Sequence, residues 1–128
     1  MPSLRFSRIP GEFAVCQLPA DTNLPHWAQS FFSITRTADE LSIVCLAQQV
    51  PADVKSERGW ACLKLEGPFP FTMTGVLASF LQPLAQAQIS IFALSTFETD
   101  YVLVKEHAVA AAVEALGHAG HVFVKDAR

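Results

Sequence analysis

A short polar turn between two apolar runs is the feature that most constrains how this chain can fold. Residues 89–95 (ISIFALS) and 100–105 (DYVLVK) have strand-like composition, and the connection between them permits only an antiparallel hairpin. Turns that merely reverse a chain usually carry Gly, Asn or Pro. The residues here are Thr96, Phe97, Glu98, Thr99 and Asp100. This turn can therefore present an aromatic ring, carboxylates and hydroxyls to a small cationic or zwitterionic ligand.

Strand-like and helix-like segments alternate around this hairpin. The expected helices cover residues 75–88 and 106–117, and the expected outer strands cover residues 59–66 and 121–124. The order strand–helix–strand–strand–helix–strand is the ferredoxin-like βαββαβ motif. We therefore expect an α/β (α+β) fold with an antiparallel sheet and its helices on one face.

The helix expected at residues 75–88 carries one apolar stripe. Its members, spaced to fall on a single helical face, are Leu77, Phe80, Leu81 and Leu84. Thr74 precedes the helix and is the expected N-cap. Pro83 lies inside it and removes a backbone hydrogen bond, so we expect a bend near residues 79–83.

The N-terminal half reads as a shorter copy of the same pattern. Residues 11–18 resemble a strand, and residues 33–44 align without gaps onto residues 93–104, at a constant offset of 60. This alignment places Glu40 on Asp100. An internal repeat of this kind gains weight when both copies share one order of elements.

The helices of this copy are expected to be nearly absent. Residues 22–30 and 51–58 occupy the two helix positions but are much shorter than the later helices. We therefore expect a degenerate N-terminal domain at residues 1–58 and a full domain at 59–128. Because the shorter copy is too small to form a core alone, the two halves should pack as one unit.

Composition narrows the functional classes. The chain has 128 residues, of which 51% are hydrophobic and 16% charged, and its net charge is −3. This excludes a disordered chain, and no basic patch for nucleic acid is visible. No apolar run is long enough to span a membrane, and residues 1–13 lack the apolar core of a signal peptide. We expect a cytoplasmic homodimer that covers part of its apolar surface with a second copy.

Reactive side chains give little support for an enzyme, a metal site or a cofactor. Cys16, Cys45 and Cys62 each lie in an apolar run, which is typical of buried structural thiols. His118 and His121 are read as surface residues, because a metal site needs three or four convergent ligands. No nucleophile–base pair and no nucleotide-binding glycine motif is visible. We expect a protein that is not an enzyme and has no cofactor.

Several sequence segments carry a resemblance to a known family. They are GEFAVCQLP, FFSITRTADELSIVC and VPADVKSERGW in the first half, and TGVLASF, ISIF and STFETDYVLV in the second. Together they resemble small stand-alone bacterial proteins with two ACT domains in tandem, and they are similar to the ACT domains of CASTOR-type arginine sensors. The resemblance implies regulatory domains that pair through their sheets and bind amino acids or related molecules at a domain interface.

Three elements form the candidate ligand site. The loop that opens the first helix contains Thr72, Met73, Thr74, Gly75 and Val76, and its backbone N–H groups suit a carboxylate. The strand edge contains Ile89, Ser90, Ile91 and Phe92, and it offers main-chain groups. The turn contributes its five residues from Thr96 to Asp100, where a carboxylate can pair with an ammonium or guanidinium group. The resemblance favours Asp100 for this role, and Phe97 could cover the aliphatic part of a ligand.

Each element also has a purely structural interpretation. The loop can simply turn the chain and cap a helix, the strand edge can serve dimerisation, and the turn can be a solvated surface. The sequence thus predicts a regulatory protein that binds a free amino acid or similar zwitterion. The alternative is a dimerisation or protein-interaction module whose ligand site is vestigial.

Overall fold

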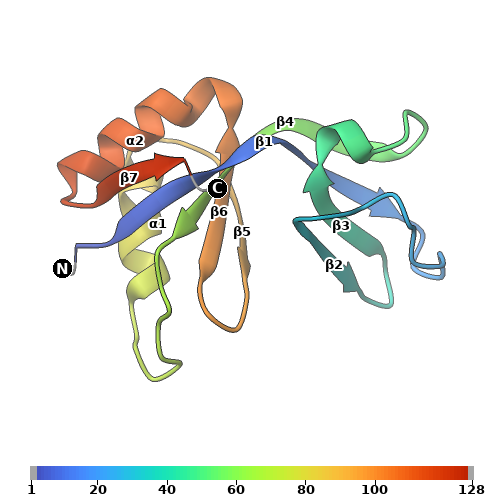
Figure 1. The fold of residues 1–128 in the computed structure, drawn as a ribbon, viewed down its shortest axis with the longest axis horizontal. Helices are drawn as coiled ribbons and strands as arrows, with labels where there is room; N and C mark the ends of the chain where they lie inside the picture. The colour runs from blue at the N-terminus through green and yellow to red at the C-terminus, as the bar shows by residue number, and fades with distance from the viewer. Residues whose placement is uncertain (1–2, 127–128) are drawn as a thin grey trace. The chain divides into compact units, whose positions relative to one another are not determined.

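The computed structural model describes residues 3–126, and within that range the chain forms two compact units (Figure 1). Gly11–Trp60 makes up one unit, called the hairpin unit here. The residues before Gly11 and after Trp60 make up the other, called the helical unit. Residues 3–10 therefore belong with the C-terminal part of the chain, although the sequence suggested an N-terminal domain that begins at residue 1.

Two long strands explain this division. β1 (Arg5–Leu18) and β4 (Lys55–Leu65) are neighbours in the sheet, and each contributes one part to each unit. The Ser7 hydroxyl donates to the Glu66 carboxylate at 2.8 Å, so the start of β1 lies beside the end of β4. A strand expected at residues 11–18 is thus extended backward by six residues, from Arg5 to Pro10.

The helical unit contains a five-stranded arrangement in the order β7-β1-β4-β6-β5. β5 (Ile91–Ser95) and β6 (Asp100–Lys105) form the predicted antiparallel hairpin. β7 (Val122–Asp126) pairs in parallel with β1. The predicted order of elements is present. The sheet differs from a four-stranded ferredoxin-like sheet because β1 lies between β7 and β4 as an additional strand.

Two helices pack against one face of these strands. α1 (Val76–Gln86) and α2 (Val109–His118) occupy the predicted positions, and a short 3₁₀ turn (Glu106–Ala108) leads into α2. Alternate strand residues point to one side of a sheet, and those of β1, β4 and β6 meet the inner faces of both helices. This core contains Phe6, Leu63, Leu65, Val102, Val104, Phe80, Leu84 and Leu116.

Two predictions about the ends of these helices were wrong. Thr74 does not cap α1; Gly75 occupies the N-cap position with φ 78°, and no side chain donates or accepts a capping bond there. His121 is not a surface residue, because only 5% of it is exposed and both of its ring nitrogens have hydrogen-bond partners. An HxxH spacing says nothing about burial, and the fold turns His121 inward beside Phe80.

The hairpin unit contains a hairpin like that of the helical unit. The correspondence between the two hairpins is shifted by one residue from the one that the sequence alignment predicted. β2 (Phe32–Arg36) and β3 (Leu41–Leu46) pair antiparallel, and Arg36 faces Leu41 as Ser95 faces Asp100. The structural offset is therefore 59, since 95 − 36 and 100 − 41 both give that value. The offset of 60 and the match of Glu40 to Asp100 were wrong; Leu41 is the counterpart of Asp100.

Prolines explain why the hairpin unit has no α-helix among its described residues. The 3₁₀ turn Ala47–Gln49 follows β3 as Glu106–Ala108 follows β6, but Pro51 then forces the preceding Val50 into extended backbone with ψ 123°. The segment between β1 and β2 contains Pro19 and Pro25 and forms turns and bends. The unit nevertheless keeps the strand order β2-β3-β1-β4.

The three cysteines are buried, as predicted. Burial raises the pKa of the Cys62 thiol to about 12. A hydrogen bond between the two thiols lowers the pKa of Cys16 and raises that of Cys45. Among residues 3–126, no helix is long and apolar enough to cross a bilayer.

Candidate functional site

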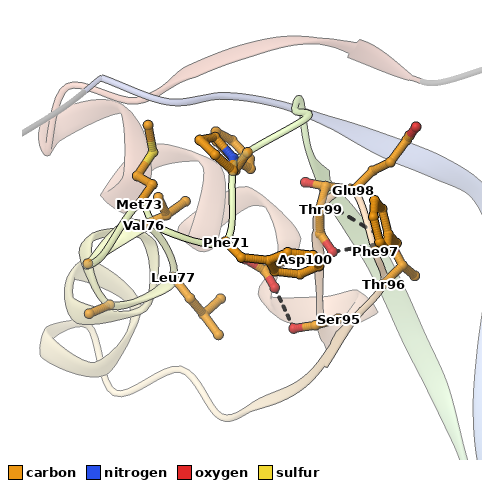
Figure 2. A pocket seen from close by; sticks show the side chains of 14 residues that line it. Phe71, Met73, Val76, Leu77, Ser95, Thr96, Phe97, Glu98, Thr99 and Asp100 are labelled. Atoms are coloured by element: carbon orange, nitrogen blue, oxygen red, sulfur yellow. Dashed lines mark hydrogen bonds between the residues drawn. The ribbon is translucent and has the colours of Figure 1, made fainter.

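A cavity of about 350 Å³ lies in the helical unit between the loop that precedes α1 and the β5–β6 turn (Figure 2). Met73, Gly75 and Val76 line it from the loop and the start of the helix. All five predicted turn residues, Thr96 to Asp100, line it from the hairpin. The structure thus brings together two of the three elements that the sequence singled out.

Hydrogen bonds fix the shape of the turn. The N–H of Thr96 donates to the carbonyl of Thr99 at 2.8 Å. Thr99 is 7% exposed, and its hydroxyl donates to the carbonyl of Leu65 in β4 at 2.7 Å. Thr99 is therefore an anchor that ties the turn to the sheet, and its hydroxyl is engaged before any ligand arrives.

The loop before α1 is fastened to the same turn. The N–H of Phe69 donates to the carbonyl of Glu98 at 3.0 Å. At Gly67, an added Cβ atom would lie 2.9 Å from that same carbonyl oxygen, which is too close for any other residue without a shift. Gly67 therefore allows the loop and the turn to meet and form the wall of the cavity.

The first turn of α1 presents unpaired backbone donors at the cavity. The first backbone bond of the helix runs from the N–H of Ser79 to the carbonyl of Gly75 at 3.0 Å. The N–H groups of Val76, Leu77 and Ala78 precede that bond, and all three residues line the cavity. A Cβ atom added at Gly75 would meet nothing within 4 Å, so the space beside it is open.

The opposite wall carries negative charge. Asp100 and Glu98 both line the cavity, and no Lys or Arg does. Ser95 donates its hydroxyl to the Asp100 carboxylate, which holds that side chain toward α1, whereas the Glu98 carboxylate points away from the loop (Figure 2). A helix N-terminus facing a carboxylate complements a molecule that bears both an anionic and a cationic group.

Two exposed aromatic rings line the cavity. Phe71 and Phe97 pack edge to face with ring centroids 5.1 Å apart, although they are 75% and 81% exposed. They also line a second, more apolar hollow of about 390 Å³ formed with Pro68, Phe69 and Pro70. The two rings give the site an apolar rim beside its carboxylates.

Comparison with known proteins agrees with this geometry. A family model described as an ACT domain matches residues 55–117, which include α1, the β5–β6 hairpin and the cavity between them. A second model, described as an N-terminal domain, matches residues 11–53. Residues 55–117 belong to the ACT-domain family.

Individual relatives extend this assignment. The crystal structure of protein Atu0741 from Agobacterium tumefaciens has 38% sequence identity and a TM-score of 0.93, over 100% of this chain and 97% of that one. The human cytosolic arginine sensor for mTORC1 subunit 1 is 32% identical over an alignment of 95 residues that covers 68% of this chain. The match spans 29% of the length of that sensor.

A more distant solved structure supports the ACT fold alone. The regulatory subunit of aspartate kinase from Thermus thermophilus has a TM-score of 0.60 and 14% identity, over 89% of this chain and 95% of that one. At that identity, the likeness concerns the arrangement of strands and helices.

The third predicted element lies apart from the cavity of this ACT domain. Ile91 and Phe92 belong to β5, which ends the strand order of the helical unit, and Ile89 packs against its core. Ile89, Ser90, Ile91 and Phe92 do not line the cavity, nor do the side chains of Thr72 and Thr74. The strand edge and the cavity are thus separate features of one unit.

Sequence reasoning missed several residues that line the cavity. Phe69, Pro70 and Phe71 belong to the GPFPF segment, whose prolines and glycine are typical of a rigid loop. Ser95 was read as an ordinary strand residue, and the register that pairs it with Asp100 gives its role. Within residues 3–126, no group of three or more His, Cys, Asp or Glu side chains is placed to hold a metal ion.

Proposed function

We propose that this protein is a regulatory ACT-domain protein that binds a free amino acid in the cavity between the start of α1 and the β5–β6 turn. The single observation that carries this proposal is the pairing of a helix N-terminus with the Asp100 carboxylate across a cavity of about 350 Å³. An amino acid offers the matching charges: its carboxylate would accept from the N–H groups of residues 76–78, and its ammonium group would approach Asp100.

The similarity to a named arginine sensor supports L-arginine as the first ligand to test. Glu98 also lines the cavity, so its negative charge would favour a ligand with a cationic side chain, although its carboxylate points away from the loop. The exposed rings of Phe71 and Phe97 could cover an aliphatic side chain and interact with a guanidinium group through their faces. Binding would regulate a partner protein or the dimer by favouring the state that binds the ligand better.

The hairpin unit is proposed to be a degenerate second ACT domain. It keeps the strand order β2-β3-β1-β4 and a hairpin related to β5–β6 by an offset of 59. Among the described residues it has no α-helix, and hence no helix N-terminus beside its turn. We therefore propose one amino acid site per chain, in a cytoplasmic homodimer.

A second candidate function is a dimerisation or protein-interaction module. β5 ends the strand order of the helical unit, and an edge strand offers main-chain groups to another chain. Phe71, Met73 and Phe97 are half or more exposed, which is unusual for large apolar side chains in a monomer. In that case the exposed rings would contact a protein and the cavity would stay empty.

The deciding experiment is a thermal-unfolding screen against the twenty amino acids, with L-arginine and L-lysine titrated over several concentrations. A ligand that binds the folded state stabilises it by RT ln(1 + [L]/Kd), so a binding amino acid should raise the Tm with concentration. Asp100→Asn keeps the shape of the side chain and its acceptor for Ser95 but removes the charge, and should lower the affinity by at least tenfold.

The matched control is Asp39→Asn in the turn of the hairpin unit. That turn has the same Thr-to-carbonyl bond, from the N–H of Thr37 to the carbonyl of Glu40 at 2.9 Å, but none of its residues lines the cavity. The control should bind like the unaltered protein. A flat screen across all twenty amino acids would reject the ligand-binding function and favour the interaction module.

A further inference from the structure

We propose that His121 is a positioning residue that holds the ligand-facing first turn of α1 in place through a continuous chain of hydrogen bonds. His121 lies between α2 and β7 and does not line the cavity. Its influence would reach the cavity through Ser79, one turn into α1. The consequence for affinity rests on the proposed function, whereas the positioning itself does not.

The reason for this arrangement is Pro83. In an α-helix, the carbonyl of Ser79 would accept a hydrogen bond from the N–H of residue 83, but proline has no N–H. Ser79 is 3% exposed, so water cannot readily replace the missing donor. The Nε2 atom of His121 lies 3.0 Å from this carbonyl oxygen and takes the place of the absent backbone donor.

The hydrogen bonds assign the tautomer of His121. A carbonyl oxygen can only accept, so Nε2 must carry the proton in its contact with Ser79. The N–H of Leu4 donates to Nδ1 at 3.1 Å, so Nδ1 must be unprotonated. The neutral ring thus accepts on one side from the backbone just before β1 and donates on the other side to α1.

Ser79 passes this restraint to the residues that face the cavity. Its N–H donates to the carbonyl of Gly75 at 3.0 Å, and its hydroxyl donates to the carbonyl of Val76 at 2.8 Å. Both Gly75 and Val76 line the cavity. All three polar groups of Ser79 are therefore used, one to receive His121 and two to hold the first turn of the helix.

The test uses two substitutions whose effects on the Ser79 carbonyl should cancel. His121→Phe keeps a ring of similar size but removes the partner of the Leu4 N–H and leaves the buried Ser79 carbonyl unpaired. Pro83→Ala supplies the missing backbone N–H, so in the double variant this new donor should take over the bond to Ser79. His118→Phe is the control, because His118 is exposed in the last turn of α2.

Amide hydrogen exchange gives the primary readout and requires no ligand. The Ser79 amide should exchange about tenfold faster in His121→Phe, as expected for loss of a buried hydrogen bond of about 1.4 kcal/mol. The double variant should return to within about twofold of the unaltered protein, and His118→Phe should not differ from it. Faster exchange that Pro83→Ala fails to reverse would overturn the proposal, because His121 would then be needed only for general packing.

The nitrogen chemical shifts of the His121 ring test the tautomer in the unaltered protein, even if a variant does not fold. Shifts typical of a protonated Nε2 and unprotonated Nδ1 support the proposal, and the reverse pattern overturns it. L-arginine titration then separates the two hypotheses. If the unaltered protein binds L-arginine, His121→Phe should weaken binding about tenfold and Pro83→Ala should restore it. If no amino acid binds, the proposed function fails while the exchange result still decides the role of His121.

Discussion

The two hairpins of this protein share a turn hydrogen bond, but among the described residues only the β5–β6 hairpin has α-helices in its own unit. In β2–β3 and in β5–β6, a Thr N–H donates to a carbonyl three residues later, at 2.9 and 2.8 Å. The difference lies in what precedes the hairpin: α1 in the helical unit, and turns and bends in the hairpin unit. The start of α1 thus supplies the second wall of the cavity that the β5–β6 turn lines.

The largest expected effect concerns whether the two units unfold together. Phe80 is fully buried in the core of the helical unit, so Phe80→Ala should lower the free energy of unfolding by about 3–5 kcal/mol. The α-helices described lie in the helical unit, and Trp27 and Trp60 lie in the hairpin unit. Circular dichroism at 222 nm and tryptophan fluorescence therefore report different units.

We expect both signals to shift together in Phe80→Ala, because β1 and β4 run through both units. Coincident transitions in denaturant would establish one cooperative unit. A fluorescence transition that keeps its midpoint while the dichroism transition moves would mean that the hairpin unit is stable without the helical unit.

The next effect separates the anchored turn from the exposed one. Thr99→Val removes the donor to the Leu65 carbonyl and leaves a buried acceptor unpaired, which should cost about 1–3 kcal/mol. Thr37→Val makes the same change of residue type in the other hairpin, where the hydroxyl lies in an exposed turn, and should cost about 0.5 kcal/mol or less. Urea unfolding of both variants measures the difference; equal losses would contradict an anchoring role for Thr99.

A pair of glycines tests the cavity at nearly constant backbone strain. Gly75 and Gly59 have φ 78° and 83°, and an added Cβ atom would meet nothing within 4 Å at either position. Alanine at each should cost about 1–2 kcal/mol through the left-handed conformation alone. Only Gly75→Ala should also reduce the Tm increase caused by a binding amino acid, and Gly75→Val should abolish it. The same reduction in Gly59→Ala would show that strain, and not crowding of the cavity, is responsible.

The smallest effect at neutral pH concerns the thiol of Cys62. Burial raises its pKa from 9.0 to about 12 in the folded protein, so folding favours the protonated thiol. The resulting contribution to stability is fully present below pH 9 and is lost as the pH rises toward 12. Cys62→Ala should therefore flatten the decline of stability above pH 9, measured by urea unfolding at several pH values. If stability declines above pH 9 just as steeply in Cys62→Ala, the deprotonation of other groups must cause that decline.

The sequence predicted local structure better than long-range pairing. Both hairpins and both helices follow from residue patterns that span fewer than about 20 positions, whereas the loop and the turn of the cavity were grouped through the family resemblance. The insertion of β1 between β7 and β4 joins residues that are far apart in sequence, and no local pattern encodes it. The one-residue error in the repeat has the same origin, because the similarity of residues 33–44 to 93–104 does not specify which residues face each other.

The misplacement of His121 is a further example. Its neighbours in sequence are Gly120 and Val122, which give no sign of burial, whereas its partners Leu4 and Ser79 lie 117 and 42 positions away. The polar turn was recognised because its unusual residues are contiguous. Its carboxylates could be identified as candidates from the sequence. The hydroxyl of Ser95 and the rings of the GPFPF loop could be assigned to the cavity only once the fold was known.

The parallel pairing of β1 with β7 also has a consequence for folding kinetics. The Leu4–His121 contact closes a loop of 117 positions, whereas each hairpin closes a loop of only a few residues. Closing a long loop costs more chain entropy, and contacts between distant residues slow folding. During synthesis, the start of β1 leaves the ribosome first, yet its partner in β7 leaves more than a hundred residues later. The joining of these two strands should therefore be a late step, and until then one edge of β1 is exposed to chaperones and to other nascent chains.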